Sequence, residues 1–244
     1  DSLPKVLVTE SPALELLIPF LSRFKSIKHV IDLGSKYKGQ FFGYREIIAE
    51  SSEQWIEMEP SPEDMALIFY ASGPSFCPRG VMLSHQCLVK ETMILGDRFQ
   101  QTEQDIVMLY ALPMYHVFGL IAVVLTAVCK ASTVVMVPGT GLSISSFMAA
   151  IEREKGTMFP GVPYIFALAV DMAEKEGIKN DLSSLRLCHS SADSLPASVV
   201  KRFKKLYSLS IIDCFALTEA VCHVTCPPLD GGGEPGSVGK ALPG

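Results

Sequence analysis

The sequence lacks a long apolar run and a block of positive charge. Its longest apolar stretch, residues 117–129, is shorter than the ~20 residues that a membrane-spanning helix needs, so we expect a buried core helix there. The net charge is −5 with scattered cations, and a nucleic-acid backbone is therefore not an expected partner. Seven cysteines, an odd number with no secretory signal before them, predict reduced thiols and a cytoplasmic location.

What the sequence contains favours a packed α/β protein. Apolar residues make up 48% and charged residues 19% of the chain, which is typical of globular domains. Apolar runs at 5–9 and 29–33 flank a helical pattern at 13–24, and this order of strand, helix and strand predicts parallel pairing. Short apolar runs at 106–112, 133–137, 185–189 and 210–215 alternate with further helical patterns. We therefore predict mainly parallel sheets flanked by helices.

One loop carries the most chemical information. A strand-like run at 65–70 breaks into small, hydroxyl-bearing and turn-forming residues and resumes at 81–83. The backbone N–H groups and the cation of such a loop can surround a phosphate. The spacing is not that of a Walker A loop, because Arg79 precedes Gly80 instead of following it. On spacing alone, an ordinary Gly/Pro hairpin turn remains the alternative.

This loop resembles the phosphate-binding loop of the adenylate-forming enzymes, which include acyl-CoA ligases, firefly luciferase and peptide-synthetase adenylation domains. The family pattern is Tyr-Thr-Ser-Gly-Thr-Thr-Gly-x-Pro-Lys-Gly-Val-Met-Leu-Ser-His. The chain departs from it at Pro74, Phe76 and Arg79, where the family has a hydroxyl residue, glycine and lysine. The positions that match are Tyr70, Ser72, Gly73, Pro78, Gly80 and residues 81–85. The resemblance implies a catalytic role on the phosphates for Arg79 and phosphate contacts at Ser72, Gly73, Ser75 and Gly80.

Two further stretches resemble nucleotide-binding segments of the same family. Residues 212–220 are similar to its Gly-Tyr-Gly-Met/Leu-Thr-Glu segment. That similarity implies that Phe215 packs against adenine, that Thr218 meets a phosphate and that Glu219 binds Mg²⁺, which a carboxylate suits. Residues 185–195 are similar to the Leu-Arg-x-x-x-Ser-Gly-Gly/Ala-Ala-Pro-Leu segment, which implies nucleotide contacts at Ala192 and Asp193. Without the family, 212–220 would be a strand end followed by a helix start.

Two other stretches resemble the substrate-binding segments. Residues 111–119 are similar to the family segment Pro-Leu/Met-Phe-His-x-x-Gly, whose histidine lies beside the acyl carboxylate, so the resemblance gives this role to His116. Outside the family, a lone histidine after a strand is more often structural. Residues 159–163 are similar to the segment that lines the acyl tunnel, which implies substrate contacts at Gly161 and Val162. The residues of the matching motifs are most similar to those of long-chain fatty-acyl and 4-coumarate CoA ligases.

Together, these resemblances imply an acyl-CoA ligase. It would convert a fatty or aromatic carboxylic acid and ATP, with Mg²⁺, into an acyl-adenylate and pyrophosphate, and then into a thioester of coenzyme A. Residues 1–244 would be part of the large AMP-binding domain, without the small C-terminal domain, so we do not expect this chain alone to complete the reaction. Two alternatives stay open. One is a degenerate binding module with little adenylation, and the other is a luciferase-like oxygenase.

A weaker pattern is Cys222-His223-x-x-Cys226. Its spacing hints at a metal site, but no second ligand pair stands at zinc-finger spacing in the sequence. We therefore do not expect a zinc finger. The neighbouring Ser190, Ser191 and His189 do not indicate a nucleophilic triad either, because a triad is a spatial arrangement that adjacency in sequence does not support.

The three departures in the loop give a testable prediction. Phe76 replaces a glycine, and positive φ is strained for a bulky residue; Pro74 removes an N–H donor; Arg79 differs from lysine in shape and hydrogen-bond geometry. If the loop limits adenylation, the full-length protein carrying Pro74→Thr, Phe76→Gly and Arg79→Lys together will exchange pyrophosphate into ATP faster than the unmodified protein. Equal rates would show that the loop is not limiting.

Overall fold

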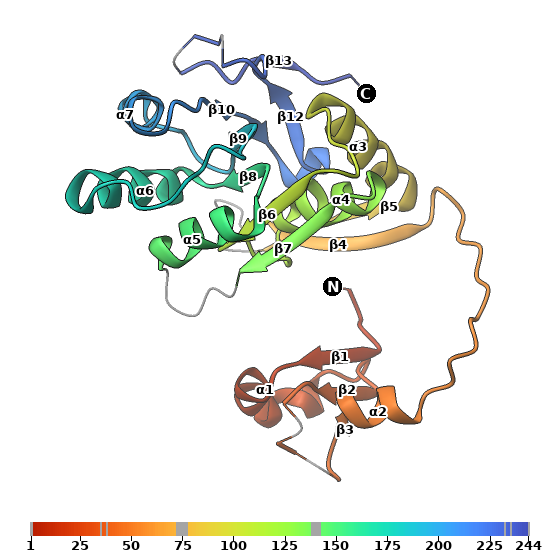
Figure 1. The fold of residues 1–244 in the computed structure, drawn as a ribbon. Coiled ribbons are helices and arrows are strands. Elements are labelled where there is room, and N and C mark those ends of the chain that lie inside the picture. Colours follow the sequence, from red (N-terminus) through yellow and green to blue (C-terminus); the bar gives the residue numbers. More distant parts are fainter. Residues whose placement is uncertain are drawn as a thin grey trace. The chain divides into compact units, whose positions relative to one another are not determined.

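The computed structural model describes residues 2–34, 36–37, 39–71, 78–137, 143–231, 233–234 and 236–243. They fall into two compact units, Asp1–Pro60 and Ser61–Gly244 (Figure 1). None of the helices in these ranges has the length and apolarity to cross a membrane.

The first unit is a small parallel sheet with the order β1-β2-β3. The predicted order of strand, helix and strand is confirmed, because β1 (Val6–Thr9) and β2 (His29–Asp32) pair in parallel around α1 (Ser11–Leu17). A 3₁₀ turn over Ile18–Arg23 completes the crossover, and β3 (Phe42–Gly43) leads directly into α2 (Tyr44–Glu50). Buried Asp32 fixes the crossover by accepting a 2.7 Å hydrogen bond from the Ser11 hydroxyl.

The second unit is built on five parallel strands in the order β10-β9-β8-β6-β7. In chain order they are β6 (Ile106–Tyr110), β7 (Thr133–Val137), β8 (Met158–Gly161), β9 (Leu187–Ser190) and β10 (Ile211–Asp213). Every pairing among them is parallel. The predicted fold class is therefore confirmed.

Helices cover both faces of this sheet. Met108 and Tyr110 of β6 pack into a core with α5 (Ile144–Glu154), α6 (Pro163–Glu176) and α7 (Ala197–Tyr207). Val107 and Leu109 of the same strand pack into a second core with α3 (His85–Arg98) and the helix after β6. Successive strand residues point to opposite faces, so a sheet that is apolar on both faces needs helices on both. Figure 1 shows α5–α7 on one side and α3 and α4 (Thr126–Cys129) on the other.

The strand order reverses at one place in the sheet. Strand β6 lies between β7 and β8, and the chain adds β7 on one side before it adds β8, β9 and β10 on the other. The helix after β6 packs into the second core, whereas α6, which follows β8, packs into the first. The connections that leave the carboxyl ends of β6 and β8 therefore turn to opposite faces. Such a reversal opens a crevice where α/β sheets bind ligands.

The predicted core helix at 117–129 forms, but its first part is a π-helix over Phe118–Leu125 that continues into α4. Apolar side chains surround this segment, so its periodicity could not distinguish the two helix types. π-Helices are rare and are found mostly at functional sites. This one begins directly after the segment that contains His116.

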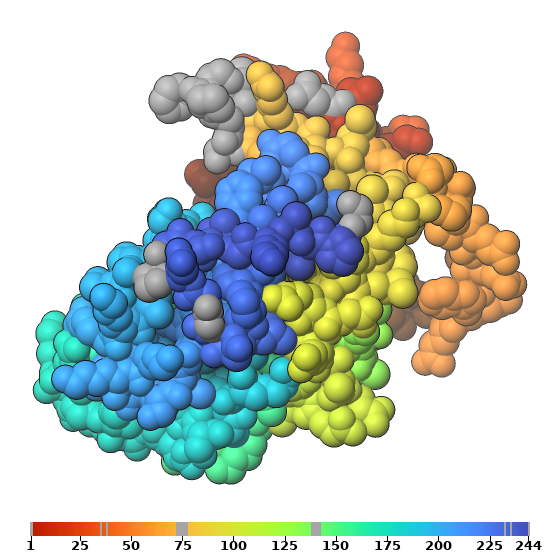
Figure 2. All heavy atoms as spheres, turned by 90° about the horizontal axis from the view of Figure 1, so that it is seen from above, coloured from red at the N-terminus to blue at the C-terminus, as the bar shows by residue number. Residues whose placement is uncertain are grey.

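Two antiparallel elements complete the second unit. Strands β4 (Met65–Ala71) and β5 (Arg79–Ser84) form a hairpin. The strand predicted at 210–215 is divided: β10 ends at Asp213, and β11 (Phe215–Ala216) joins a separate sheet with β12 (His223–Cys226) and β13 (Lys240–Ala241). We did not predict this sheet. Figure 2 shows the C-terminal segment between α3 and α7, and a hydrogen bond from Arg98 of α3 to the Pro227 carbonyl ties it down.

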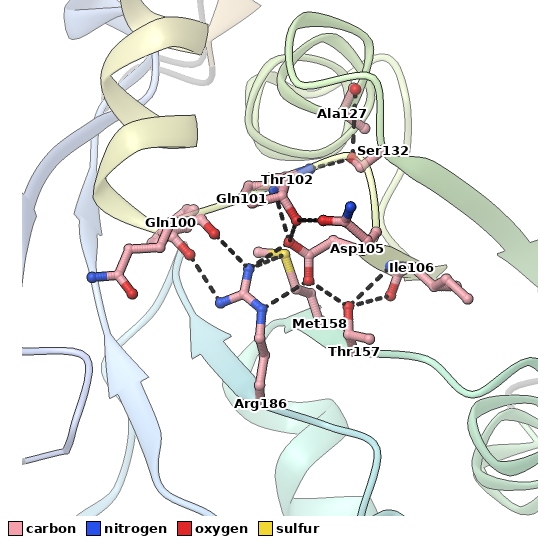
Figure 3. Close-up of polar contacts among 12 residues, drawn as sticks. Gln100, Gln101, Thr102, Asp105, Ile106, Ala127, Ser132, Thr157, Met158 and Arg186 are labelled. Atoms are coloured by element: carbon pink, nitrogen blue, oxygen red, sulfur yellow. Dashed lines mark hydrogen bonds and ion pairs between the residues drawn. The ribbon is translucent and has the colours of Figure 1, made fainter.

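A polar network holds the amino edge of the main sheet (Figure 3). The guanidinium of Arg186, before β9, donates two 2.7 Å hydrogen bonds to the carboxylate of Asp105, before β6. The same carboxylate accepts from the Thr157 hydroxyl before β8 and from the Thr102 backbone N–H. Burial alone would raise the pKa of Asp105, but these hydrogen bonds outweigh it and hold the pKa below its ordinary value. One buried carboxylate thus joins the starts of three strands.

We expect Asp105→Asn to destabilise the protein by about 2–3 kcal/mol, because it removes the negative charge of a buried ion pair and leaves Arg186 without its partner. The cost is moderate because the Arg186 side chain is about one-third exposed, and water screens its charge. Urea denaturation measures the change. The control is Asp171→Asn, which removes an exposed pair with Arg202 and should cost under about 1 kcal/mol.

A carboxyl group with a lowered pKa stabilises the fold above its unfolded pKa. The difference in the free energy of unfolding between the wild type and Asp105→Asn should therefore reach its maximum above pH 3.8. It should fall to zero as acidification protonates Asp105 in the folded protein. A difference that persists at low pH would contradict this.

Candidate active site

The candidate site segments follow the ends of four parallel strands. Tyr110 ends β6 directly before the segment with His116, and Gly161 ends β8. Ser190 ends β9 and Asp213 ends β10, each within a predicted nucleotide segment. Because parallel strands end at the same edge of a sheet, these segments gather along one edge. The Asp105 network lies at the opposite edge.

Backbone hydrogen bonds join the loops after β9 and β10. The Cys214 N–H donates to the Ser190 carbonyl at 2.9 Å, and the Ser191 hydroxyl donates to the Cys214 carbonyl at 3.0 Å. The Leu195 N–H donates to the Asp213 carboxylate at 3.3 Å. The two loops thereby form the wall of a cleft of about 390 Å³. Its lining residues are Ala192, Asp193, Ser194, Leu195, Asp213, Cys214, Phe215, Ala216, Gly236 and Val238. Three predicted nucleotide contacts, Ala192, Asp193 and Phe215, are therefore brought together.

The backbone of this cleft is strained at one residue. Ala192 has a φ of 77°, a left-handed conformation that costs a residue with a side chain about 1–2 kcal/mol. Strain of this kind persists where the surrounding structure enforces it, and it clusters at functional sites. Here the hydrogen bonds that join the neighbouring Ser190 and Ser191 to Cys214 hold the backbone in this conformation.

Asp213 contributes to the cleft but was not among the predicted site residues. Its Oδ2 accepts the Leu195 N–H, whereas its Oδ1 is buried without a hydrogen-bond partner in the described part of the chain. Burial raises the pKa of Asp213, and the Asp193 carboxylate raises it further. The wall of the cleft therefore contains a buried acceptor that no described residue satisfies. A charged residue at the end of an apolar strand was the signal that could have identified it.

Thr218 and Glu219 lie in the turn beyond Phe215, outside the lining of the cleft. They form a single 3₁₀ turn over Thr218–Ala220. Val221 follows with φ 72° and ψ −57°, and the Cys222 N–H donates to the Ala220 carbonyl at 2.9 Å. This γ-turn with positive φ is a strained form, above all for a β-branched residue. It leaves Glu219 exposed and Thr218 half-buried, so the Glu219 carboxylate is accessible to a solvated cation.

His116 lies in the connection after β6, beside the reversal of strand order. Its side chain is largely exposed, and its Nδ1 accepts the Phe118 N–H at 3.2 Å. Partial burial lowers the pKa of His116, and the hydrogen bond to Nδ1 also favours a neutral ring. Gly161 and Val162 stand on the other side of the reversal, after β8. Gly161 is buried, and its carbonyl accepts the Ser191 N–H at 3.3 Å.

The predicted phosphate loop is described only in part. Arg79 and Gly80 open β5, where they pair with Ala71 and Tyr70 and are exposed. The other predicted phosphate contacts, Ser72, Gly73 and Ser75, lie outside the described residues. The part of the loop that is described therefore presents one cation, Arg79, at the loop end of the hairpin.

With this geometry established, comparisons with known proteins identify the family. A model of the AMP-binding enzyme family matches residues 1–244, and the chain belongs to this family. It is 29% identical over 181 residues to the long-chain-fatty-acid–CoA ligase of Bacillus subtilis (strain 168), covering 74% of this chain and 32% of the relative. It is 30% identical over 183 residues to the probable CoA ligase CCL5 of Humulus lupulus, covering 71% and 33%.

Solved structures agree on the fold. The crystal structure of the anthranilate CoA ligase AuaEII in complex with anthranoyl-AMP superposes with a TM-score of 0.86 at 24% identity, covering 98% of this chain and 45% of that one. The chain thus spans about a third of the length of these curated relatives and under half of that structure.

The turn that carries His116 depends on Gly119. A Cβ at this position would lie 2.9 Å from the carbonyl carbon of Pro113 and closer still to its oxygen. We expect Gly119→Ala to cost about 1–3 kcal/mol, as overpacking does, because neither backbone segment can move freely. The control is Gly96→Ala in α3, where the three atoms nearest to a Cβ belong to the flexible Lys130 side chain and not to backbone, and where helix propensity favours alanine. Thermal unfolding measures both, and equal effects would contradict the close-approach argument.

Proposed function

We propose that the protein is an acyl-CoA ligase and that this chain supplies the nucleotide-binding and acyl-binding parts of the site. The observation that carries the proposal is the cleft at the carboxyl edge of the main sheet. Two separate segments that resemble nucleotide-binding motifs form its walls. The family relationship supports the same activity.

The cleft has features that suit an adenine nucleotide. Phe215 exposes 44% of its surface and can offer a ring face to a purine. Asp213 lines the cleft, and its Oδ1, buried without a described partner, would have to become accessible to accept a hydrogen bond from an amine or a hydroxyl of the ligand. Ala192 is small, which allows its backbone to lie close to a flat ring. In this proposal these three residues hold the adenosine part of ATP and of the acyl-adenylate.

The charged residues would act on the phosphates. Glu219 is an exposed carboxylate in the turn beyond Phe215, and it would hold Mg²⁺, whose charge offsets that of the departing pyrophosphate. Thr218 would hydrogen-bond a phosphate oxygen, and Arg79 with the loop at 72–75 and Gly80 would orient the phosphates. This chain's contribution is positioning and charge stabilisation.

The acyl substrate would lie at the reversal of strand order, where His116 stands on one side and Gly161 and Val162 on the other. A neutral imidazole, favoured by its partial burial, can donate a hydrogen bond to a carboxylate from Nε2. Gly161 leaves no room for a side chain, since a Cβ would lie 3.0 Å from the Phe159 ring and 3.1 Å from the Phe166 ring. We propose a fatty or aromatic carboxylic acid as the substrate and coenzyme A as the acceptor of the acyl group.

We further propose that residues 1–244 are part of an AMP-binding domain that works together with a small C-terminal domain. The reaction would take place in the cytoplasm, where the cysteines stay reduced. In full, the proposed reaction joins the carboxylate to ATP, releases pyrophosphate and transfers the acyl group to coenzyme A.

A non-hydrolysable acyl-adenylate mimic tests the site. We expect calorimetric titration to show saturable binding, and we expect Phe215→Ala to weaken it about tenfold or more, since stacking of a base on an aromatic ring is worth ~1–3 kcal/mol. The matched control is Leu217→Ala, because Leu217 is also 44% exposed but does not line the cleft. Its affinity should be unchanged.

Glu219→Gln separates metal binding from adenosine binding. It should preserve binding of the mimic without Mg²⁺ and reduce pyrophosphate exchange by the full-length protein. If the folded protein does not bind the mimic at high concentration, the site proposal fails. Equal losses in Phe215→Ala and Leu217→Ala would show that the cleft is not the nucleotide site.

A further inference from the structure

A cluster of titratable side chains lies in the core of the second unit, apart from the residues that line the cleft. Glu91 comes from the middle of α3, His223 is the first residue of β12, and Cys222 directly precedes that strand. Their exposed fractions are 7%, 0% and 3%. Acidic residues are almost never buried to this extent without a partner, so this cluster needs a physical explanation.

The three residues offer one ligand atom each, and these atoms all lie within 4.8 Å of one another. Local contacts already orient them. The Glu91 Oε1 accepts the His223 backbone N–H at 2.8 Å, and the Cys222 Sγ lies 3.3 Å from the His223 Nδ1. The carboxylate, thiol and imidazole therefore converge from two elements that are 132 residues apart in sequence.

The hydrogen bonding of this region is incomplete. The Nε2 of His223 is buried without a hydrogen-bond partner among the described residues, and so are both ring nitrogens of His189. The two imidazoles lie side by side, with ring centroids 5.7 Å apart, and Phe99 and Phe118 contact both rings. A buried polar atom without a partner is unfavourable, and an ordered water or an ion at the site is one explanation for it.

Burial also opposes the charged forms of this cluster. It raises the pKa of Glu91 to about 7 and the pKa of the Cys222 thiol well above its ordinary value. A divalent cation would reverse both effects, because it stabilises a carboxylate and a thiolate directly. The apolar and aromatic surroundings would then strengthen the attraction between the ion and these two charges, because the effective dielectric constant there is low.

We propose that Glu91, Cys222 and His223 form a binding site for a zinc-class divalent cation. One thiolate, one imidazole and one carboxylate are the donor types that Zn²⁺ prefers, whereas Mg²⁺ and Ca²⁺ prefer oxygen alone. A tetrahedral zinc with bonds of ~2.0–2.3 Å holds its ligand atoms roughly 3.3–3.8 Å apart, so side-chain shifts of about 1 Å complete the geometry. Water takes the fourth position. The ion would join α3 to β12.

This site differs from the zinc-finger pattern considered in the sequence. That pattern required a second pair of ligands near Cys222, His223 and Cys226, and the sequence has none. In the structure Cys226 is not a member of the cluster, and the third ligand is Glu91 on a distant helix.

Metal titration tests the proposal. We expect the purified protein, first stripped with a chelator, to bind one equivalent of Zn²⁺ in competition with a chromophoric chelator. Co²⁺ should bind in the same place and give the thiolate-to-cobalt charge-transfer absorption that reports a Co–S bond. Cys222→Ser should abolish that absorption and weaken Zn²⁺ binding at least about tenfold. The control is Cys129→Ser, which removes an exposed cysteine and should leave both results unchanged.

A stability measurement keeps the test decisive if Cys222→Ser does not fold. Since an ion that binds only the folded state raises its stability, Zn²⁺ should raise the unfolding temperature of the wild-type protein and Mg²⁺ should not. Glu91→Gln, which is nearly isosteric, should lose this increase while keeping the near-UV circular dichroism of the folded protein. Absence of stoichiometric Zn²⁺ binding to the wild type, or equal binding by the wild type and Cys222→Ser, would overturn the proposal.

Discussion

The parallel pairing of the five strands from β6 through β10 is the constraint on which the rest of the larger unit depends. It forces each strand to end at the same edge and each connection to cross a face of the sheet. The chain adds strands to both sides of β6, so the crossover after β6 lies on one face and the crossovers through α5, α6 and α7 lie on the other, and the connections after β6 and β8 separate. The candidate acyl and nucleotide segments therefore follow neighbouring strand ends although they are far apart in sequence.

The two edges of this sheet have different physical characters. At the amino edge, Asp105 accepts hydrogen bonds from Arg186, Thr157 and Thr102, and its buried charge is fully used. At the carboxyl edge, Ala192 has a strained backbone and Asp213 has an unsatisfied oxygen. Unused hydrogen-bonding capacity and strain are expected where a ligand binds. Stability and binding thus depend on opposite ends of the same strands.

The small antiparallel sheet connects the candidate site to the core. Strand β11 carries Phe215 in the cleft, and the tight turn at Val221 returns the chain to β12, whose first residue, His223, meets Glu91 of α3. A change in the packing of this buried cluster would therefore be transmitted to the turn that carries Thr218 and Glu219. In the proposed ligase, the cluster would fix the position of that turn.

The sequence alone determined the α/β class and the parallel pairing, because hydrophobic periodicity and turn residues act locally. The segments that follow the strand ends were identified by their resemblance to family motifs. It did not reveal the sheet formed by β11 to β13, since strands of two to four residues carry too little periodicity. Nor could periodicity identify a π-helix in a segment that is apolar all round. The acceptor at Asp213 and the meeting of Glu91 with Cys222 and His223 were decided only by tertiary structure. Both arise from packing between elements distant in sequence, which no local pattern encodes.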